Sequence, residues 1–209
     1  MISMGRPKED RKKEHYYRAA KKEGYRSRSA YKIKQAIGEH KLLKGVNKVL
    51  ELCCCPGGWT QVLHEINASL EIVAVDLSAM LPIEGVAFIQ GDITAPETLE
   101  SIERSTGGSV DLVLSDCSPN VSGNWELDVA RQLFLAEVTI EIALRLLSGR
   151  GKVFLKVFQG KGFQEFVQSV RTTFQSVRLI KPEASRKTSA EIYLLAEHPI
   201  KKRVRNGAA

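Results

Sequence analysis

The chain has 209 residues, 43% of them hydrophobic, which suffices for one domain of ordinary size with a buried core. Its apolar runs are shorter than the roughly 20 residues of a membrane span, and the charged N-terminus lacks the apolar core of an export signal, so we expect no membrane association. The four Cys, three of them consecutive, do not have the spacing of a disulfide framework. We therefore expect a cytoplasmic protein whose Cys are reduced, small buried residues.

The net charge of +7 is unevenly distributed along the chain. Residues 1–48 carry 15 Lys/Arg against 5 Asp/Glu, whereas 49–198 carry 12 against 19. Basic ends around a mildly acidic body favour a catalytic domain whose flanks bind a polyanion. We expect a basic helical extension (1–40) that contacts RNA, a catalytic domain (41–198) and a basic, disordered tail (199–209).

Helical patterns over 8–22 and 28–38 precede the first predicted strand. Aromatic side chains among Lys and Arg stack on bases or riboses, which favours nucleic-acid contact, although they also serve as core anchors of a helix. Four tyrosines have this setting: Tyr16, Tyr17, Tyr25 and Tyr31.

Strand-like runs rich in Val, Ile and Leu then alternate with helical patterns. The predicted strands are 48–53, 71–77, 86–90, 110–115, 152–158, 176–181 and 190–196, and the predicted helices 58–66, 96–104, 126–147 and 162–174. Alternation predicts an α/β fold with a mostly parallel sheet covered by helices on both faces. The connection 182–189 is too short for a helical crossover, so the seventh strand should run antiparallel.

In such sheets, ligands bind beyond the carboxyl ends of the strands. A Cys-Cys-Cys-Pro-Gly-Gly-Trp turn (53–59) follows the first strand, and its glycines allow backbone amides to approach a ligand closely. The GxGxxG spacing is absent, which disfavours a dinucleotide. Neighbouring Cys on a strand point to opposite faces and the His are scattered, so we predict no metal site.

Carboxylates follow three successive strands at the same sheet edge. They are Asp76, about 20 residues beyond the Gly-rich turn, Asp92 and Asp116. Each alone is compatible with a helix cap or a turn. Together they favour a ligand with ribose and amino groups.

Two charged residues interrupt apolar strands. Lys156 lies within Val153–Phe158, where a buried Lys requires a partner, and we expect it to project into the ligand crevice beside Asp116. Glu191 begins the last strand. The alternatives are a Lys that reaches solvent and a charge on an edge strand.

These segments, in order, resemble the FtsJ-type (RlmE) ribosomal RNA 2′-O-ribose methyltransferases over residues 14–197. The motifs are RSRSAYK (26–32), PGGW (56–59), VAVDL (73–77), GVAFIQGDI (85–93), LSDCSPNVSG (114–123), FLKVFQG (154–160) and SRKTSAEIYLLA (185–196). The resemblance implies a class I, Rossmann-like methyltransferase fold.

The resemblance also implies a Lys-Asp-Lys-Glu catalytic tetrad at Lys32, Asp116, Lys156 and Glu191. It implies contacts to the cofactor S-adenosylmethionine at Gly57, Trp59, Asp76, Asp92 and Asp116. We place RNA binding at Arg26, Arg28 and Lys34, and expect a monomer that acts on ribosomal RNA or the large ribosomal subunit.

The implied reaction methylates the ribose of a uridine in the A-loop of large-subunit (23S) rRNA. Lys156 either accepts the proton of the 2′-hydroxyl or stabilises the developing alkoxide. One departure concerns the turn, because Glu51-Leu52-Cys53-Cys54-Cys55 replaces the family's usual Asp-Leu-Gly-Ala-Ala. Cys53 thus stands where a Gly would let backbone approach the cofactor.

Three other functions are considered. Close relatives of this family methylate riboses of the tRNA anticodon loop. A base N-methyltransferase of the same fold is disfavoured because no aromatic residue follows Asp116-Cys117-Ser118-Pro119. An RNA-binding ribosome-assembly factor without chemistry is disfavoured because all four tetrad residue types are present.

Overall fold

A computed structural model describes residues 8–184 and 189–200, with side chains described from residue 15. Most of the predicted basic tail, 201–209, lies outside the described residues, as do 1–7 of the predicted extension and 185–188 of the last predicted motif.

One seven-stranded sheet forms the centre of the molecule, with strand order β3-β2-β1-β4-β5-β7-β6. Its strands are β1 (Lys48–Leu52), β2 (Glu71–Asp76), β3 (Val86–Gln90), β4 (Val110–Ser115), β5 (Leu147–Phe158), β6 (Phe174–Ile180) and β7 (Glu191–Pro199). The first five strands pair in parallel, while β7 lies antiparallel between β5 and β6. This is the seven-stranded, mostly parallel, Rossmann-like sheet with an antiparallel last strand that the sequence predicted.

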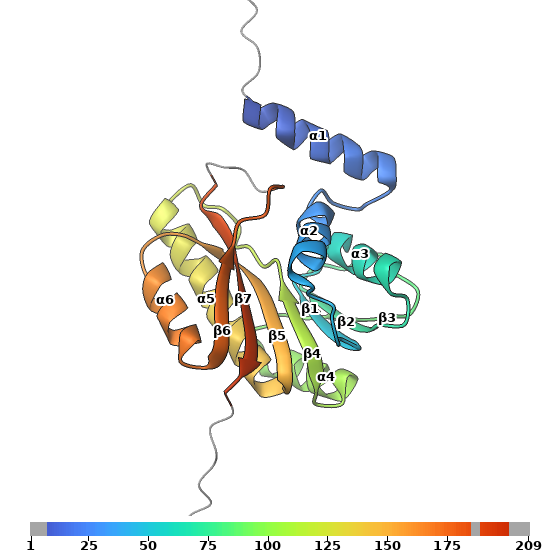
Figure 1. Ribbon diagram of the computed structural model, residues 1–209, viewed down its shortest axis with the longest axis vertical. Helices are drawn as coiled ribbons and strands as arrows, with labels where there is room; N and C mark the ends of the chain where they lie inside the picture. Colours follow the sequence, from blue (N-terminus) through green and yellow to red (C-terminus); the bar gives the residue numbers. More distant parts are fainter. Residues whose placement is uncertain (1–7, 185–188, 201–209) are drawn as a thin grey trace, which may run out of the picture.

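Helices cover both faces of the sheet (Figure 1). They are α1 (Lys8–Glu23), α2 (Ala30–His40), α3 (Gly58–Ile66), α4 (Pro96–Thr106), α5 (Trp125–Leu146) and α6 (Phe163–Arg171). β7 points away from α1 in Figure 1, so the carboxyl ends of the parallel strands face the side on which α1 lies. β5 is longer than predicted at its N-terminal end, because it begins at Leu147, directly after α5, instead of at residue 152. Its pairing with β4 shifts register between Val110 and Leu112.

Alternation along the strands fills two cores. On β5, Val153, Leu155 and Val157 pack with α5 and α6, whereas Phe154 points to the other face, against Trp59 of α3 and Tyr193 of β7. Because successive strand residues point to opposite faces, the sheet contributes apolar side chains to both cores. The second core includes α2 through Ala30, Ile33 and Ala36, so α2 packs as part of the catalytic domain.

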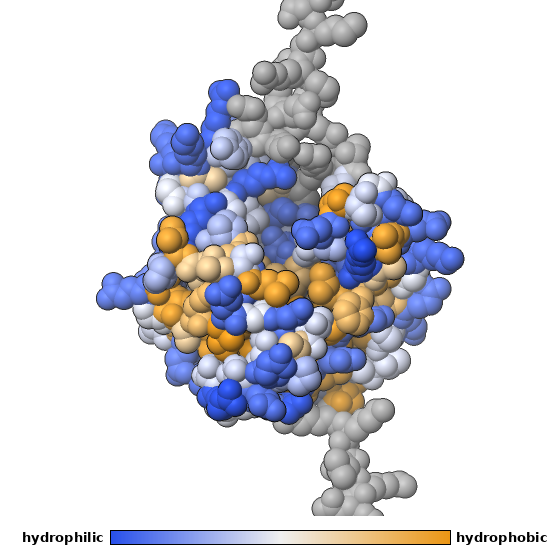
Figure 2. All heavy atoms as spheres, turned by 180° about the vertical axis from the view of Figure 1, so that it is seen from behind, coloured by the Kyte–Doolittle hydropathy of each residue, from blue (hydrophilic) through white to orange (hydrophobic). Residues whose placement is uncertain are grey.

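The surface carries hydrophobic residues in patches between polar ones, visible on the face seen in Figure 2. No helix within residues 8–184 and 189–200 is both long and apolar enough to cross a membrane.

Candidate active site

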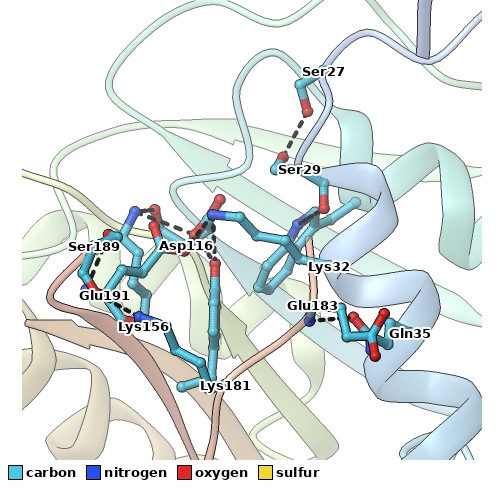
Figure 3. Close-up of polar contacts among 12 residues, drawn as sticks. Ser27, Ser29, Lys32, Gln35, Asp116, Lys156, Lys181, Glu183, Ser189 and Glu191 are labelled. Carbon is cyan, nitrogen blue, oxygen red and sulfur yellow. Dashed lines mark hydrogen bonds and ion pairs between the residues drawn. The ribbon is translucent and has the colours of Figure 1, made fainter. Parts of the chain in front are cut away.

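Two ion pairs meet at the carboxyl end of the sheet. The Lys156 ammonium lies 3.2 Å from Oδ1 of Asp116 and donates to the Asp116 carbonyl oxygen at 2.7 Å. The Lys32 ammonium, from α2, donates to Oε1 of Glu191 at 2.6 Å. Figure 3 shows these four side chains converging from four separate elements. The structure therefore brings together the four residues that the sequence grouped as a tetrad.

Tyr193 joins the two ion pairs. Its hydroxyl donates to Oδ1 of Asp116 at 2.7 Å and accepts from the Lys32 ammonium at 3.3 Å. The side chain is fully buried, and burial raises the pKa of Tyr193 well above its ordinary value, with further contributions from the negative charges of Asp116 and Glu191. The phenol thus remains a hydrogen-bond donor. Sequence analysis missed Tyr193, although its position two residues after Glu191 on a strand was a signal for the same face.

The burial of Lys156 and the strand order around Glu191 decide between the alternatives stated above for these two charged residues. Lys156 is 6% exposed and hydrogen-bonded, so its side chain does not reach for solvent. β7 is flanked by β5 and β6, so Glu191 does not lie on an edge strand. In the antiparallel register, Lys156 stands opposite Tyr193 and Phe158 opposite Glu191.

Hydrogen bonds from outside the tetrad fix its backbone. The side-chain amide of Gln132, buried on α5, donates to the carbonyl oxygens of Cys117 and Lys156. Cys117 directly follows Asp116, so these bonds hold the backbone at both members of the Asp116–Lys156 ion pair. Lys181 donates to the carbonyl oxygens of Ser189 and Glu191 and so holds the start of β7 (Figure 3).

One position of the Gly-rich turn, Gly57, requires glycine. Gly57 has φ 101°, and a Cβ there would lie 2.8 Å from Sδ of Met80 and 2.9 Å from Nη1 of Arg26. α3 begins directly after Gly57, and the peptide bond between Cys55 and Pro56 is cis. Cys53 has φ 57°, so the chain keeps a left-handed conformation at this residue without a glycine.

The strand-end carboxylates predicted to hold the cofactor are half-buried and keep acceptor capacity. Asp76 accepts from the Cys55 and Ser78 amides, each at 2.8 Å, and Oδ1 of Asp92 accepts from the amide and hydroxyl of Thr94. A carboxylate has about four lone-pair directions, so each can bind a further donor such as a ribose hydroxyl. The residues present therefore fit a ligand carrying a ribose.

Trp59, also predicted to contact the cofactor, has its side chain inside the second core. The indole is 2% exposed and donates to the Ser29 carbonyl oxygen at 2.9 Å. In this position the ring anchors α3 to the segment before α2, so any cofactor contact of Trp59 would come from its backbone.

Arg26 forms a latch between the N-terminal segment and two loops of the sheet. Its guanidinium donates to the carbonyl oxygens of Pro56 at 3.3 Å, Leu81 at 2.6 Å and Pro82 at 3.1 Å. Its backbone amide donates to the side chain of Gln61 on α3. Most donors of Arg26 are thereby used inside the protein, which sequence analysis did not anticipate.

The other two residues predicted to contact RNA, Lys34 and Arg28, differ in their surroundings. The Lys34 ammonium donates to the Tyr25 hydroxyl at 2.7 Å and lies within 4.0 Å of Glu23 and Glu65. Arg28 is half-buried. On α1, Tyr17 is 61% exposed, and Lys21 and Lys22 are exposed beside it.

Cys53 and Cys117 form a disulfide, so the expectation that all four Cys are reduced was wrong. The physical reason lies in the sheet: Leu52 of β1 is in register with Ser115 of β4, so the loops that follow these strands are neighbours. The two Cα atoms are 5.0 Å apart, within disulfide range, despite 64 residues of separation along the chain. Cys54 and Cys55 are free thiols, and within the described residues no group of three or more His, Cys, Asp or Glu could hold a metal ion.

A buried carboxyl lies beneath the site. Glu51 of β1 is 2% exposed and accepts from the Thr60 hydroxyl at 2.7 Å. Burial raises the pKa of Glu51 to about 8; the Thr60 hydrogen bond opposes this rise, and the charges of Asp116 and Asp76 add to it.

Reduction of the disulfide should lower the free energy of unfolding by about 2–4 kcal/mol, because the bridge restricts the unfolded chain. Denaturant unfolding with and without reductant measures this. Cys54→Ser should keep the reductant sensitivity, whereas the double variant Cys53→Ser/Cys117→Ser should lack it. Equal unfolding midpoints of the wild type in both conditions would show that the bridge does not stabilise the fold.

Between about pH 5 and pH 8, Glu51 should be protonated in the folded chain and ionised in the unfolded chain. The unfolded state binds fewer protons in this window, so stability should fall as the pH rises. Glu51→Gln should flatten this part of the profile, measured by denaturant unfolding at several pH values. Glu137→Gln, an exposed position on α5, is the control. An unchanged slope in Glu51→Gln would contradict the assignment.

Comparison with known proteins gives consistent results. A profile of the FtsJ-like methyltransferase family matches residues 25–198. The chain is 46% identical over 195 residues to the ribosomal RNA large subunit methyltransferase E of Methanothrix thermoacetophila, covering 93% of this chain and 76% of that protein.

Two solved structures share the fold. A candidate ribosomal RNA methyltransferase from Plasmodium falciparum superposes with a TM-score of 0.76 at 26% identity, covering 85% of this chain and 100% of the other. A candidate methyltransferase from Streptococcus mutans in complex with S-adenosylhomocysteine superposes with a TM-score of 0.50 at 16% identity, covering 76% and 93%. The likeness at this lower identity concerns the fold alone. With the family profile matching residues 25–198 and a relative at 46% identity, the chain belongs to the FtsJ-like methyltransferase family.

Proposed function

We propose that the chain transfers a methyl group from S-adenosylmethionine to a ribose 2′-hydroxyl, with a uridine in the A-loop of large-subunit rRNA as the target. The observation that carries this proposal is the convergence of two ammonium–carboxylate pairs, one with the buried Lys156 and one half-buried, at the carboxyl end of the sheet. A weak oxygen nucleophile needs a base or a stabilising charge at this point.

The donor is inferred from the family and from the strand-end carboxylates. A solved structure of the same fold holds S-adenosylhomocysteine, the demethylated form of the donor. Asp76 and Asp92 would hold the ribose and amino groups of the donor, and the turn around Gly57 would lie against it. When bound, the donor supplies an electrophilic methyl group on a sulfonium.

The chain's own residues would activate and align the hydroxyl. The new bond joins the 2′-oxygen to the methyl carbon as the carbon–sulfur bond breaks, and the hydroxyl proton leaves. Lys156, held by Asp116, would receive that proton if its side chain is the neutral amine; as the ammonium it would instead stabilise negative charge on the oxygen. Lys32, held by Glu191 and Tyr193, would add a second positive charge on the side of the RNA substrate.

The RNA would be held by the basic N-terminal segment. α1 lies on the side of the carboxyl ends of the strands and exposes Tyr17 beside Lys21 and Lys22 (Figure 1). The named relative acts on large-subunit rRNA, which supports a ribosomal substrate and a cytoplasmic place of action. A monomer suffices for this geometry, because all four tetrad residues come from one chain.

Lys156→Ala should abolish methyl transfer while leaving cofactor affinity near normal, because Lys156 is proposed to act on the hydroxyl and is not among the residues expected to contact the donor. Incorporation of labelled methyl into rRNA measures activity, and calorimetric titration measures affinity and reports a folded protein. Lys44→Ala, an exposed lysine, is the control. Resistance of the modified linkage to alkali and nuclease would locate the methyl group on the ribose. A methyl group found on a base, or on tRNA, would refute the proposal. Full activity of Lys156→Ala would also refute it.

Arg28→Glu should weaken RNA binding and reduce the slope of log affinity against log salt by about one phosphate contact. RNA affinity at several salt concentrations measures this, with Arg104→Glu on α4, 70% exposed, as the control. Arg26→Glu is unsuitable because it breaks the latch to Pro56, Leu81 and Pro82. Unaltered RNA affinity of Arg28→Glu would assign this segment a purely structural role.

A further inference from the structure

An aromatic pair lies next to the tetrad and is unused by the proposed mechanism. The rings of Trp125 and Phe158 stack with centroids 5.8 Å apart and planes inclined by 20°. Phe158 is half-buried against the core, whereas half of the Trp125 side chain is exposed. Phe158 thus supports one face of the indole, and the exposed part of the indole faces solvent.

The pair is close to the proposed reacting groups. Phe158 stands opposite Glu191 in the β5–β7 register and two residues beyond Lys156. At the rise of a β-strand, that places its Cα about 7 Å from the Cα of Lys156. Lys161, three residues after Phe158 along the chain, is exposed and positively charged.

Trp125 is held in place rather than carried on a loose loop. It is the first residue of α5, whose N-cap Asn124 accepts from the Leu127 amide. The carboxylate of Asp128 accepts from the amide and hydroxyl of Ser122, which closes the preceding loop onto the helix, and these bonds lower the pKa of Asp128.

One turn further along, α5 is tied to the tetrad. Gln132 donates to the Cys117 and Lys156 carbonyl oxygens, so the distance from Trp125 to the tetrad is set by a rigid helix. A preorganised aromatic surface costs little entropy on binding.

We propose that Trp125, supported by Phe158, is the stacking platform for the nucleobase of the nucleotide whose ribose is methylated. Sequence-specific RNA recognition commonly stacks an unpaired base on an aromatic side chain. Phe158 is the register partner of Glu191, a member of the tetrad, so a nucleotide reaching Lys156 would place its base toward the indole. This inference rests on the proposed function and adds to it the requirement that the target nucleotide be unstacked from its neighbours.

Fluorescence tests binding without relying on catalysis. The chain has two tryptophans, of which Trp59 is buried and Trp125 exposed, so quenching by a short oligouridylate should come from Trp125. Trp125→Phe should lose this quenching while retaining the Trp59 emission as an internal reference. An equal quench in wild type and Trp125→Phe would overturn the proposal.

Kinetics test the position of the base. Trp125→Ala should raise the KM for rRNA by about 5- to 150-fold, the range expected for the loss of one base–aromatic stack, and leave cofactor affinity unchanged. Trp125→Phe should recover most of this loss. Phe134→Ala removes another exposed aromatic residue of α5, 53% exposed, and should behave as wild type.

An RNA with an abasic nucleotide at the mapped methylation site separates the hypotheses. It should be a poor substrate for the wild type, and Trp125→Ala should show little further loss with it, because the two changes remove the same contact. Additive losses, or an unchanged KM of Trp125→Ala on intact RNA, would reject the platform while leaving ribose methylation standing. Absence of methyl transfer by the wild type would instead refute the proposed function, and the quenching experiment would still decide on the platform.

Discussion

The pairing of Lys156 with Asp116 is the constraint on which the site depends. An ammonium group in an apolar strand is tolerated only where a counter-charge and hydrogen bonds replace water. Asp116 provides both, through its carboxylate and its carbonyl oxygen. Since Asp116 can do so only if β4 and β5 are neighbours with level ends, the sheet order and the ion pair require each other.

The antiparallel β7 extends this constraint to the second ion pair. Running opposite to β5, it starts at the edge where the parallel strands end, so its first residues reach the site. Glu191 and Tyr193 are thereby placed beside Lys156, and Tyr193 connects Asp116 with Lys32 of α2. The short connection between β6 and β7, residues 181–190, thus determines the composition of the site, because a helical crossover would have reversed the strand.

Sequence patterning sufficed for the sheet, its helices and the antiparallel last strand, because Val, Ile and Leu runs and their spacing are local signals. The tetrad was predicted from the family resemblance, and its closeness in space follows from strand ends that meet at one edge. Three features escaped. Tyr193 looked like an ordinary strand residue, and Arg26 looked like a surface cation. The Cys53–Cys117 bridge depends on the register of β1 against β4, which no local pattern encodes.

The Arg26 latch makes the N-terminal segment and the loops around Gly57 and Met80 parts of one mechanical unit. Its guanidinium holds carbonyl oxygens from both loops, and the same segment continues into α2, which carries Lys32. Under the proposed function, a nucleic acid that displaced this segment would also displace the loops proposed to lie against the methyl donor. Reciprocity of binding free energies would then require the donor to change the affinity for the nucleic acid by the same factor.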